Sequence, residues 1–113
     1  MSQLISLAKA IEMTTLHRRE KENILDAAAK NQGTLPKCET FSRDVFDAIL
    51  AQAGCDGIRI YYGMDELMKV HALIVGVNVN DEDIVDRESL NSLIIENSRR
   101  CPDDCPPASP LNE

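Results

Sequence analysis

Four cysteines and two histidines are the residues of this 113-residue chain best suited to metal or thiol chemistry. The closest pair is Cys101 and Cys105, in the segment RRCPDDCPPASPLNE at residues 99–113. Two thiols at this spacing suit half of a zinc site or a reversible disulfide. A third hypothesis is that the pair has no chemical role and that the prolines stiffen a segment that docks on another surface.

A zinc site needs four tetrahedral ligands, which usually come as two close pairs of Cys or His. The sequence has no second close pair, so Cys38, Cys55 or His71 would complete a site with Cys101 and Cys105 only through the fold. We therefore expect no metal and no cofactor, and keep a zinc site built from these residues as an alternative.

Redox chemistry at the same pair needs a stabilised thiolate. Arg99 and Arg100 favour the thiolate of Cys101, whereas two aspartates between the cysteines disfavour it, so the local charges nearly cancel. A Cys101–Cys105 disulfide is sterically conceivable, and a redox site stays open beside the zinc site.

Other chemistry has weaker support. Cys38 or Cys55 with His71 can be written as a nucleophilic dyad, but no local motif supports it. The acidic stretch 78–86 lacks the turn glycine and the glutamate spacing of a calcium loop. We therefore predict that the protein is not an enzyme.

Charge argues against two classes of partner. Residues 1–50 carry seven Lys/Arg and seven Asp/Glu, whereas residues 51–113 carry five and twelve, so the net charge of −7 lies in the second half. Phosphate backbones and anionic lipid surfaces repel such a chain. The basic cluster HRREK at 17–21 includes a glutamate and precedes another, so we expect neither nucleic acid nor membrane as a partner.

The beginning of the sequence has no basic leader followed by an apolar run, and no apolar stretch approaches the length that spans a bilayer. We therefore expect a soluble cytoplasmic protein whose cysteines are reduced.

The elements that would position these residues are two helices followed by strands. Apolar residues at helical spacing predict one long helix over about 3–31, ending near Gly33. A second amphipathic helix begins at Ser42 as its N-cap and ends at Gly54. Seven polar residues, 17–23, interrupt the apolar face of the first helix, so its two ends could serve different contacts.

The second half of the chain has the alternation of strands. The alternation in GIRIYYG at 57–63 predicts a half-buried strand. Residues 69–79 are predicted to form a central strand, because both faces of this second strand are apolar from Ala72 to Val77. Residues 90–97 suit either a helix or a third strand, and we favour the strand. The prediction is an α+β domain over residues 1–98, helical over 1–54 and strand-rich over 55–98 in an antiparallel meander. A separate Cys/Pro-rich tail covers residues 99–113.

Three blocks in this order, GIRIYYG, ALIVGVNVNDEDI and CPDDCP, resemble a group of small uncharacterised bacterial proteins over roughly residues 55–112. The resemblance implies that the Cys-Pro tail belongs to the folded unit. It implies no activity, cofactor or catalytic residue.

Together, these observations predict a non-enzymatic structural or protein-interaction module that associates with itself. A proline-stiffened tail loses less entropy on docking than a flexible one, so the tail is expected to dock on its own domain or on a neighbour. An adaptor or inhibitor of one dedicated protein partner is a further alternative. The residues expected at the interface are Leu4, Leu7, Ile11, Cys101, Pro106, Pro107 and Leu111.

Overall fold

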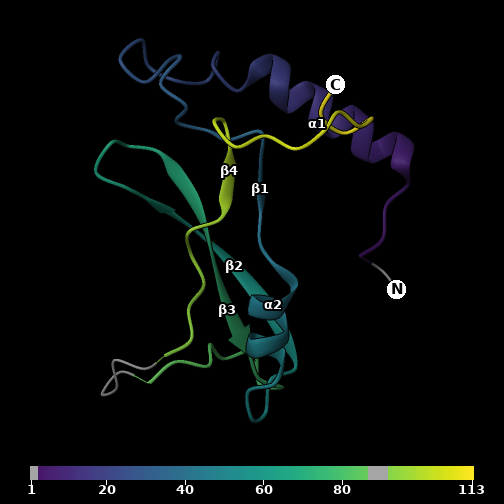
Figure 1. Ribbon diagram of the computed structural model, residues 1–113, viewed down its shortest axis with the longest axis vertical. Coiled ribbons are helices and arrows are strands. Elements are labelled where there is room, and N and C mark those ends of the chain that lie inside the picture. The colour runs from purple at the N-terminus through teal and green to yellow at the C-terminus, as the bar shows by residue number, and fades with distance from the viewer. Residues whose placement is uncertain (1–2, 87–91) are drawn as a thin grey trace.

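This computed structural model describes residues 3–86 and 92–113, in which two helices and two small antiparallel sheets are joined by turns and loops (Figure 1). The elements follow the order α1 (Leu7–Glu20), β1 (Cys38–Thr40), α2 (Arg43–Leu50), β2 (Gly57–Met64), β3 (Val70–Val77) and β4 (Arg99–Cys101). The α+β class agrees with the prediction. The three-stranded meander does not, because each sheet has two strands, β2 with β3 and β1 with β4.

The first helix is shorter than predicted. Ser6 caps its start by accepting a hydrogen bond from the Lys9 N–H at 3.0 Å. His17, Arg18 and Arg19 occupy its last turn, where positive charge stabilises the negative end of the helix dipole. The predicted helix over 3–31 is therefore wrong: α1 begins at Leu7 and ends at Glu20, so these cations lie at its C-terminal end instead of in its middle, and turns follow to Gly33.

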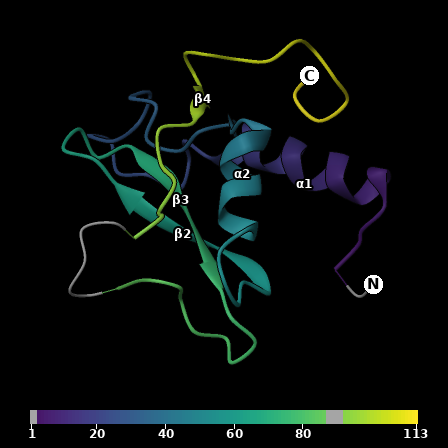
Figure 2. The same ribbon diagram turned by 60° about the horizontal axis from the view of Figure 1, so that its bottom comes forward.

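The second helix and the long hairpin were predicted well. α2 starts after Ser42, as expected, but the Ser42 side chain makes no capping hydrogen bond, and the helix ends at Leu50, before Gly54. β2 and β3 pair in register from Gly57 opposite Val77 to Met64 opposite Val70. Figure 2 shows α2 beside this hairpin, whereas α1 lies apart from it.

The core is small. Ile49 of α2 packs on Ala72 and Ile74 of β3, and Ile49 and Ile74 are the largest side chains that are fully buried among the described residues. Val75 points to the opposite face of β3 and is also buried, at 2% exposure. Both faces of β3 are therefore covered at its centre, as its apolar sequence predicted.

The predicted third strand is reduced to one bridge. Ile95 exchanges two main-chain hydrogen bonds with Ile74, both of 2.8 Å, in an isolated antiparallel bridge. The rest of the predicted strand over 90–97 adds no further pair at the described positions 92–97, and positions 90 and 91 lie outside the described residues.

Candidate functional site

The outer edge of β3, the edge that faces away from β2, is where most parts of the chain meet. Its main-chain groups bind four segments that are distant in sequence. The Val70 N–H donates to the Thr34 carbonyl at 2.8 Å, Ile74 pairs with Ile95, and the Gly76 carbonyl accepts from the Ile84 N–H at 2.8 Å. The fourth segment is the β1–β4 sheet, which reaches this edge through side chains.

Two oppositely charged residues provide that contact. Glu39 and Arg100 face each other across the β1–β4 ladder. The Glu39 carboxylate accepts the Ala72 N–H at 2.9 and 3.2 Å and the Ser98 hydroxyl at 2.9 Å. The Glu39 carboxylate therefore provides the hydrogen-bond acceptor for a main-chain N–H of β3 that a third strand would otherwise provide.

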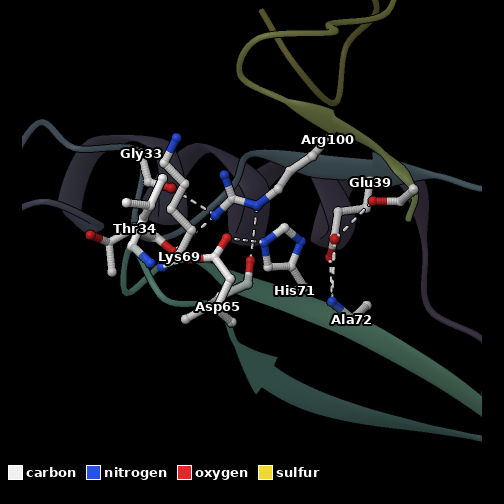
Figure 3. Close-up of polar contacts among 11 residues, drawn as sticks. Gly33, Thr34, Glu39, Asp65, Lys69, His71, Ala72 and Arg100 are labelled. Carbon is white, nitrogen blue, oxygen red and sulfur yellow. Dashed lines mark hydrogen bonds and ion pairs between the residues drawn. The ribbon is translucent and has the colours of Figure 1, made fainter. Parts of the chain in front are cut away.

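Arg100 makes the larger set of contacts (Figure 3). Its Nε donates to the Val70 carbonyl at 2.9 Å, and its terminal nitrogen donates to the carbonyls of Gly33 at 2.7 Å and Thr34 at 2.9 Å. Thr34 is buried, at 5% exposure, and its hydroxyl donates to the Ala29 carbonyl. One guanidinium thus joins the turn at 33–34, the start of β3 and the sheet that contains β4.

The Cys101–Cys105 pair lies at the end of this second sheet and forms a disulfide, with the two Cα atoms 4.5 Å apart. The expectation of four reduced cysteines therefore differs from the structure at this pair. Cys38 is a free cysteine and stands directly opposite Cys101 in the β1–β4 register. Directly opposite residues of an antiparallel ladder place their side chains on the same face.

The zinc alternative gains no support from this arrangement. Sulfur atoms in a disulfide are not available as thiolate ligands. Within the described ranges, 3–86 and 92–113, no three His, Cys, Asp or Glu side chains gather in a group that could hold a metal ion. The Cys55 thiol donates instead to the Gly57 carbonyl at 3.4 Å.

His71 lies on the hairpin and binds a carboxylate rather than a cysteine. Its Nε2 lies 2.7 Å from an Asp65 carboxylate oxygen, and the other oxygen of Asp65 accepts the N–H groups of Leu67 and Lys69. The hydrogen bond from His71 is the main cause that lowers the pKa of Asp65 below its ordinary value of 3.8. The imidazole and the carboxylate also fix the turn of the hairpin.

This pair borders a cavity of about 320 Å³ that is lined by Gly63, Met64, Asp65, His71, Leu73 and Glu96. An imidazole oriented by a carboxylate can take up or release a proton. Among the described residues that line this cavity, there is no Ser, Thr or Cys that could act as a nucleophile beside the imidazole. The dyad of His71 with Cys38 or Cys55 has no hydrogen bond in the structure.

A second polar cluster lies on the face of the hairpin opposite α2. The Arg59 guanidinium donates to an Asp83 carboxylate oxygen at 2.7 Å and also binds Asp81, and the Tyr61 hydroxyl donates to the other oxygen of Asp83. Tyr61 is the main cause that lowers the pKa of Asp83, and the same hydrogen bond raises the pKa of Tyr61. Asp81 and Asp83 of the predicted acidic loop are therefore bound to side chains of β2.

Comparison of the chain with protein-family models, with curated proteins and with solved structures finds no match in any of the three. The resemblance of residues 55–112 to a group of bacterial proteins stays a prediction.

The residues predicted at an interface fall into two groups, one at α1 and the segment before it and one in the tail. Leu4 and Leu7 are exposed, at 73% and 60%, and Ile11 is half-buried. In the tail, Pro106, Pro107 and Leu111 are exposed, whereas Cys101 is buried at 3%. Figure 1 shows the end of the tail beside α1, where Arg18 donates to the carbonyls of Leu111 and Glu113.

Glu39 and Asp65 were not predicted from the sequence to have any role, and Arg100 was considered only for its effect on the Cys101 thiol. Single charged residues in short segments have no periodicity that marks them. Glu39 lies between Cys38 and Thr40, whereas Arg100 follows another arginine, so no alternation marks either residue.

No helix among the described residues has the length and apolar character needed to cross a bilayer.

Proposed function

We propose that this chain is a non-enzymatic structural or protein-interaction module that associates with itself. The observation that carries the proposal is the amount of surface the single chain leaves exposed. Its accessible surface is 8503 Å², whereas a compact monomer of this mass exposes about 6,200 Å². The excess is about 2,300 Å², and a stable protein–protein contact buries about 800 Å² or more on each partner.

The dimensions of the chain support the same conclusion. Its radius of gyration is 16.1 Å, compared with about 13 Å for a compact domain of this length. Large apolar side chains lie on this extended surface instead of in a core. Those with at least half of their area exposed at the N-terminal end are Leu4, Ile5, Leu7, Met13 and Leu16.

Burial of apolar surface is the main favourable term in folding and in association. A chain that buries so few side chains by itself gains the missing burial by packing on another chain. The exposed residues around α1, together with the neighbouring tail at Pro106, Pro107 and Leu111, form the interface that this proposal names.

The direct test is the mass of the full chain in solution, measured by sedimentation equilibrium from about 1 to 200 µM. We expect a multiple of 12.5 kDa at the upper concentrations. Since the acidic second halves of two chains repel each other, association should strengthen with added salt. A monomer of 12.5 kDa at every concentration contradicts self-association.

A matched pair of variants locates the contact. Leu7→Lys places a charge on the exposed surface of α1, and Ile24→Lys places the same charge at an aliphatic side chain that is 76% exposed elsewhere. Leu7→Lys should weaken association at least tenfold, and Ile24→Lys should leave it unchanged. Equal effects of both variants would mean that added charge, not the α1 surface, controls association.

An adaptor or inhibitor of one dedicated partner would use the same exposed surface. This alternative expects the purified chain to remain monomeric and to form a complex of defined mass only with that other protein. The sedimentation experiment therefore separates it from self-association.

A redox role is the second candidate, and the Cys101–Cys105 disulfide supports it. Cys38 stands opposite Cys101, so its thiolate can attack the Cys101 sulfur. A Cys38–Cys101 bond then forms, the Cys101–Cys105 bond breaks, and Cys105 leaves as the thiolate. Peptide mapping of the wild type and of Cys38→Ser should show the exchanged bond in the wild type alone. A single Cys101–Cys105 linkage in both proteins at all pH values would exclude the exchange.

A further inference from the structure

The outer edge of β2, the edge that faces away from β3, has no hydrogen-bonding partner among the residues that the structure describes. In β3, the main-chain groups that bind other segments belong to even-numbered residues, namely Val70, Ala72, Ile74 and Gly76. Main-chain groups alternate in direction along a strand, so the odd-numbered residues of β3 face β2. The register pairs odd with odd positions, for example Arg59 with Val75.

It follows that the even-numbered residues of β2 direct their N–H and C=O groups away from the hairpin. These residues are Ile58, Ile60, Tyr62 and Met64. Among residues 3–86 and 92–113, no segment outside the hairpin forms a hydrogen bond with these main-chain groups. We call this row the free edge of β2.

Natural sheets usually protect such an edge with proline, lysine, a bulge or a covering segment. β2 has the sequence GIRIYYGM, without proline or lysine, and pairs with β3 over eight residues without interruption. Ile58 packs against the core, but the other three side chains on the α2 side are exposed, at 50% for Ile60, 77% for Tyr62 and 56% for Met64. By contrast, five different segments satisfy the outer edge of β3, counting β1 and β4 separately.

We propose that the free edge of β2 pairs antiparallel with β2 of a second copy of this chain, giving a four-stranded sheet in the order β3–β2–β2–β3. This inference rests on the proposed self-association and adds a second contact to the α1 surface. It predicts an isologous dimer with a two-fold axis perpendicular to the sheet. That axis keeps the same face of both hairpins on one side of the new sheet.

The two-fold axis restricts the register. Outward-facing groups must meet outward-facing groups, so even-numbered residues pair with even-numbered residues. The two registers that pair most of β2 are centred on its two middle residues, Ile60 and Tyr61. A centre at Tyr61 places Asp56 opposite Glu66 of the second copy, and like charges directly opposite destabilise a sheet. The centre at Ile60 avoids that repulsion.

With the centre at Ile60, the segment GIRIYYG is complementary to itself. Ile60 meets its own copy, Ile58 meets Tyr62 and Gly57 meets Gly63 of the second copy. β-branched and aromatic side chains form favourable cross-strand pairs. Each facing even-numbered pair exchanges two main-chain hydrogen bonds.

Charge and area favour a second copy as the occupant of this edge. Arg59 is the one charged residue in β2, within a chain of net charge −7, so two acidic chains meet here without opposing carboxylates. The excess surface of about 2,300 Å² per chain exceeds the roughly 800 Å² that a standard contact needs from each partner. Both the β2 contact and the α1 surface can therefore be buried in one assembly.

The first test uses the wild-type chain and measures amide hydrogen exchange by NMR at concentrations below and above association. The N–H groups of Arg59 and Tyr61 face β3, so their exchange should be slow at both concentrations. The N–H groups of Ile60 and Tyr62 should exchange quickly in the monomer and at least tenfold more slowly in the assembly. An assembly in which Ile60 and Tyr62 still exchange quickly would overturn the β2 contact.

The second test compares Ile60→Lys with Ile24→Lys, two exposed isoleucines that receive the same charge. Sedimentation equilibrium should give a dissociation constant at least tenfold larger for Ile60→Lys than for the wild type. Ile24→Lys should keep the wild-type dissociation constant, and the circular dichroism of both variants should be unchanged. If Ile60→Lys loses its circular dichroism signal, Tyr62→Lys replaces it with the same expectation, because Tyr62 is more exposed.

The outcomes separate the two proposals. A wild-type monomer overturns both self-association and the β2 contact. A wild-type oligomer that Ile60→Lys leaves intact, while Leu7→Lys disrupts it, keeps self-association and overturns the β2 contact. An oligomer that depends on Ile60 and shows the alternating protection of β2 supports both.

Discussion

Arg100 should contribute far more to stability than its neighbour Arg99, although both are arginines of the same three-residue strand. Arg100 donates to the carbonyls of Val70, Gly33 and Thr34. The Arg99 side chain is exposed and forms no hydrogen bond or ion pair with any described residue. The substitutions Arg100→Met and Arg99→Met therefore remove the same side chain from two different environments.

The expected cost follows from the carbonyls left without a donor. The Thr34 carbonyl also accepts the Val70 N–H, so it keeps a partner when Arg100 is replaced. The carbonyls of Val70 and Gly33 lose theirs, and an unsatisfied buried group costs about 1–3 kcal/mol. We expect Arg100→Met to lower the free energy of unfolding by about 2–4 kcal/mol, since water reaches part of this half-buried site.

Urea unfolding followed by circular dichroism measures this difference, at a protein concentration below association. With a denaturant slope of about 1.5 kcal/mol per M, the midpoint of Arg100→Met should fall by about 1–3 M. Arg99→Met should stay within about 0.5 kcal/mol of the wild type. Arg100→Lys should lie between them, because one ammonium group cannot reproduce the planar fork of the guanidinium.

Two results would refute this reasoning. Equal midpoints for Arg100→Met and Arg99→Met would mean that Arg100 does not hold the two sheets together. A wild-type midpoint for Arg100→Lys would mean that charge at this position is sufficient and that the three-carbonyl geometry is unimportant.

Three further perturbations test other parts of the structure. Ile49→Ala should cost about 2–5 kcal/mol by leaving a cavity at a fully buried position, whereas Leu50→Ala at a half-exposed position should cost less than about 1 kcal/mol in the same urea assay. Gly76→Ala should cost about 1–3 kcal/mol, since its new Cβ would lie 2.9–3.3 Å from side chains that cover β3. The pKa values of Asp65 and Asp83 are lowered by folding from 3.8, so their stabilisation is complete above pH about 5 and is lost as pH falls through the lower folded values.

Each of these has a contradicting outcome. Similar losses for Ile49→Ala and Leu50→Ala would place the core elsewhere, and a neutral Gly76→Ala would mean that α2 is not in close contact with β3. Urea midpoints measured from pH 6 to pH 2 should fall for the wild type, and the fall should be smaller in Asp83→Asn. An equal fall in both proteins would remove Asp83 from the acid response.

The sequence by itself determined the elements whose stabilising contacts are local or periodic. Alternation in GIRIYYG and the apolar run in 72–77 predicted β2 and β3, and helical spacing after Ser42 predicted α2. These patterns are visible because the buried face of each element repeats along the chain. The same patterns also indicated that β3 lies at the centre of the fold.

Tertiary structure alone decided which segments complete β3 and where the first helix ends. β1 and β4 have three residues each and pair across about sixty positions of sequence, so neither has a periodic pattern of its own. Glu39 and Arg100 acquire their role only because that pairing brings a carboxylate and a guanidinium to the outer edge of β3. Long-range hydrogen bonds of this kind depend on the position of the whole backbone, which no local stretch of sequence encodes.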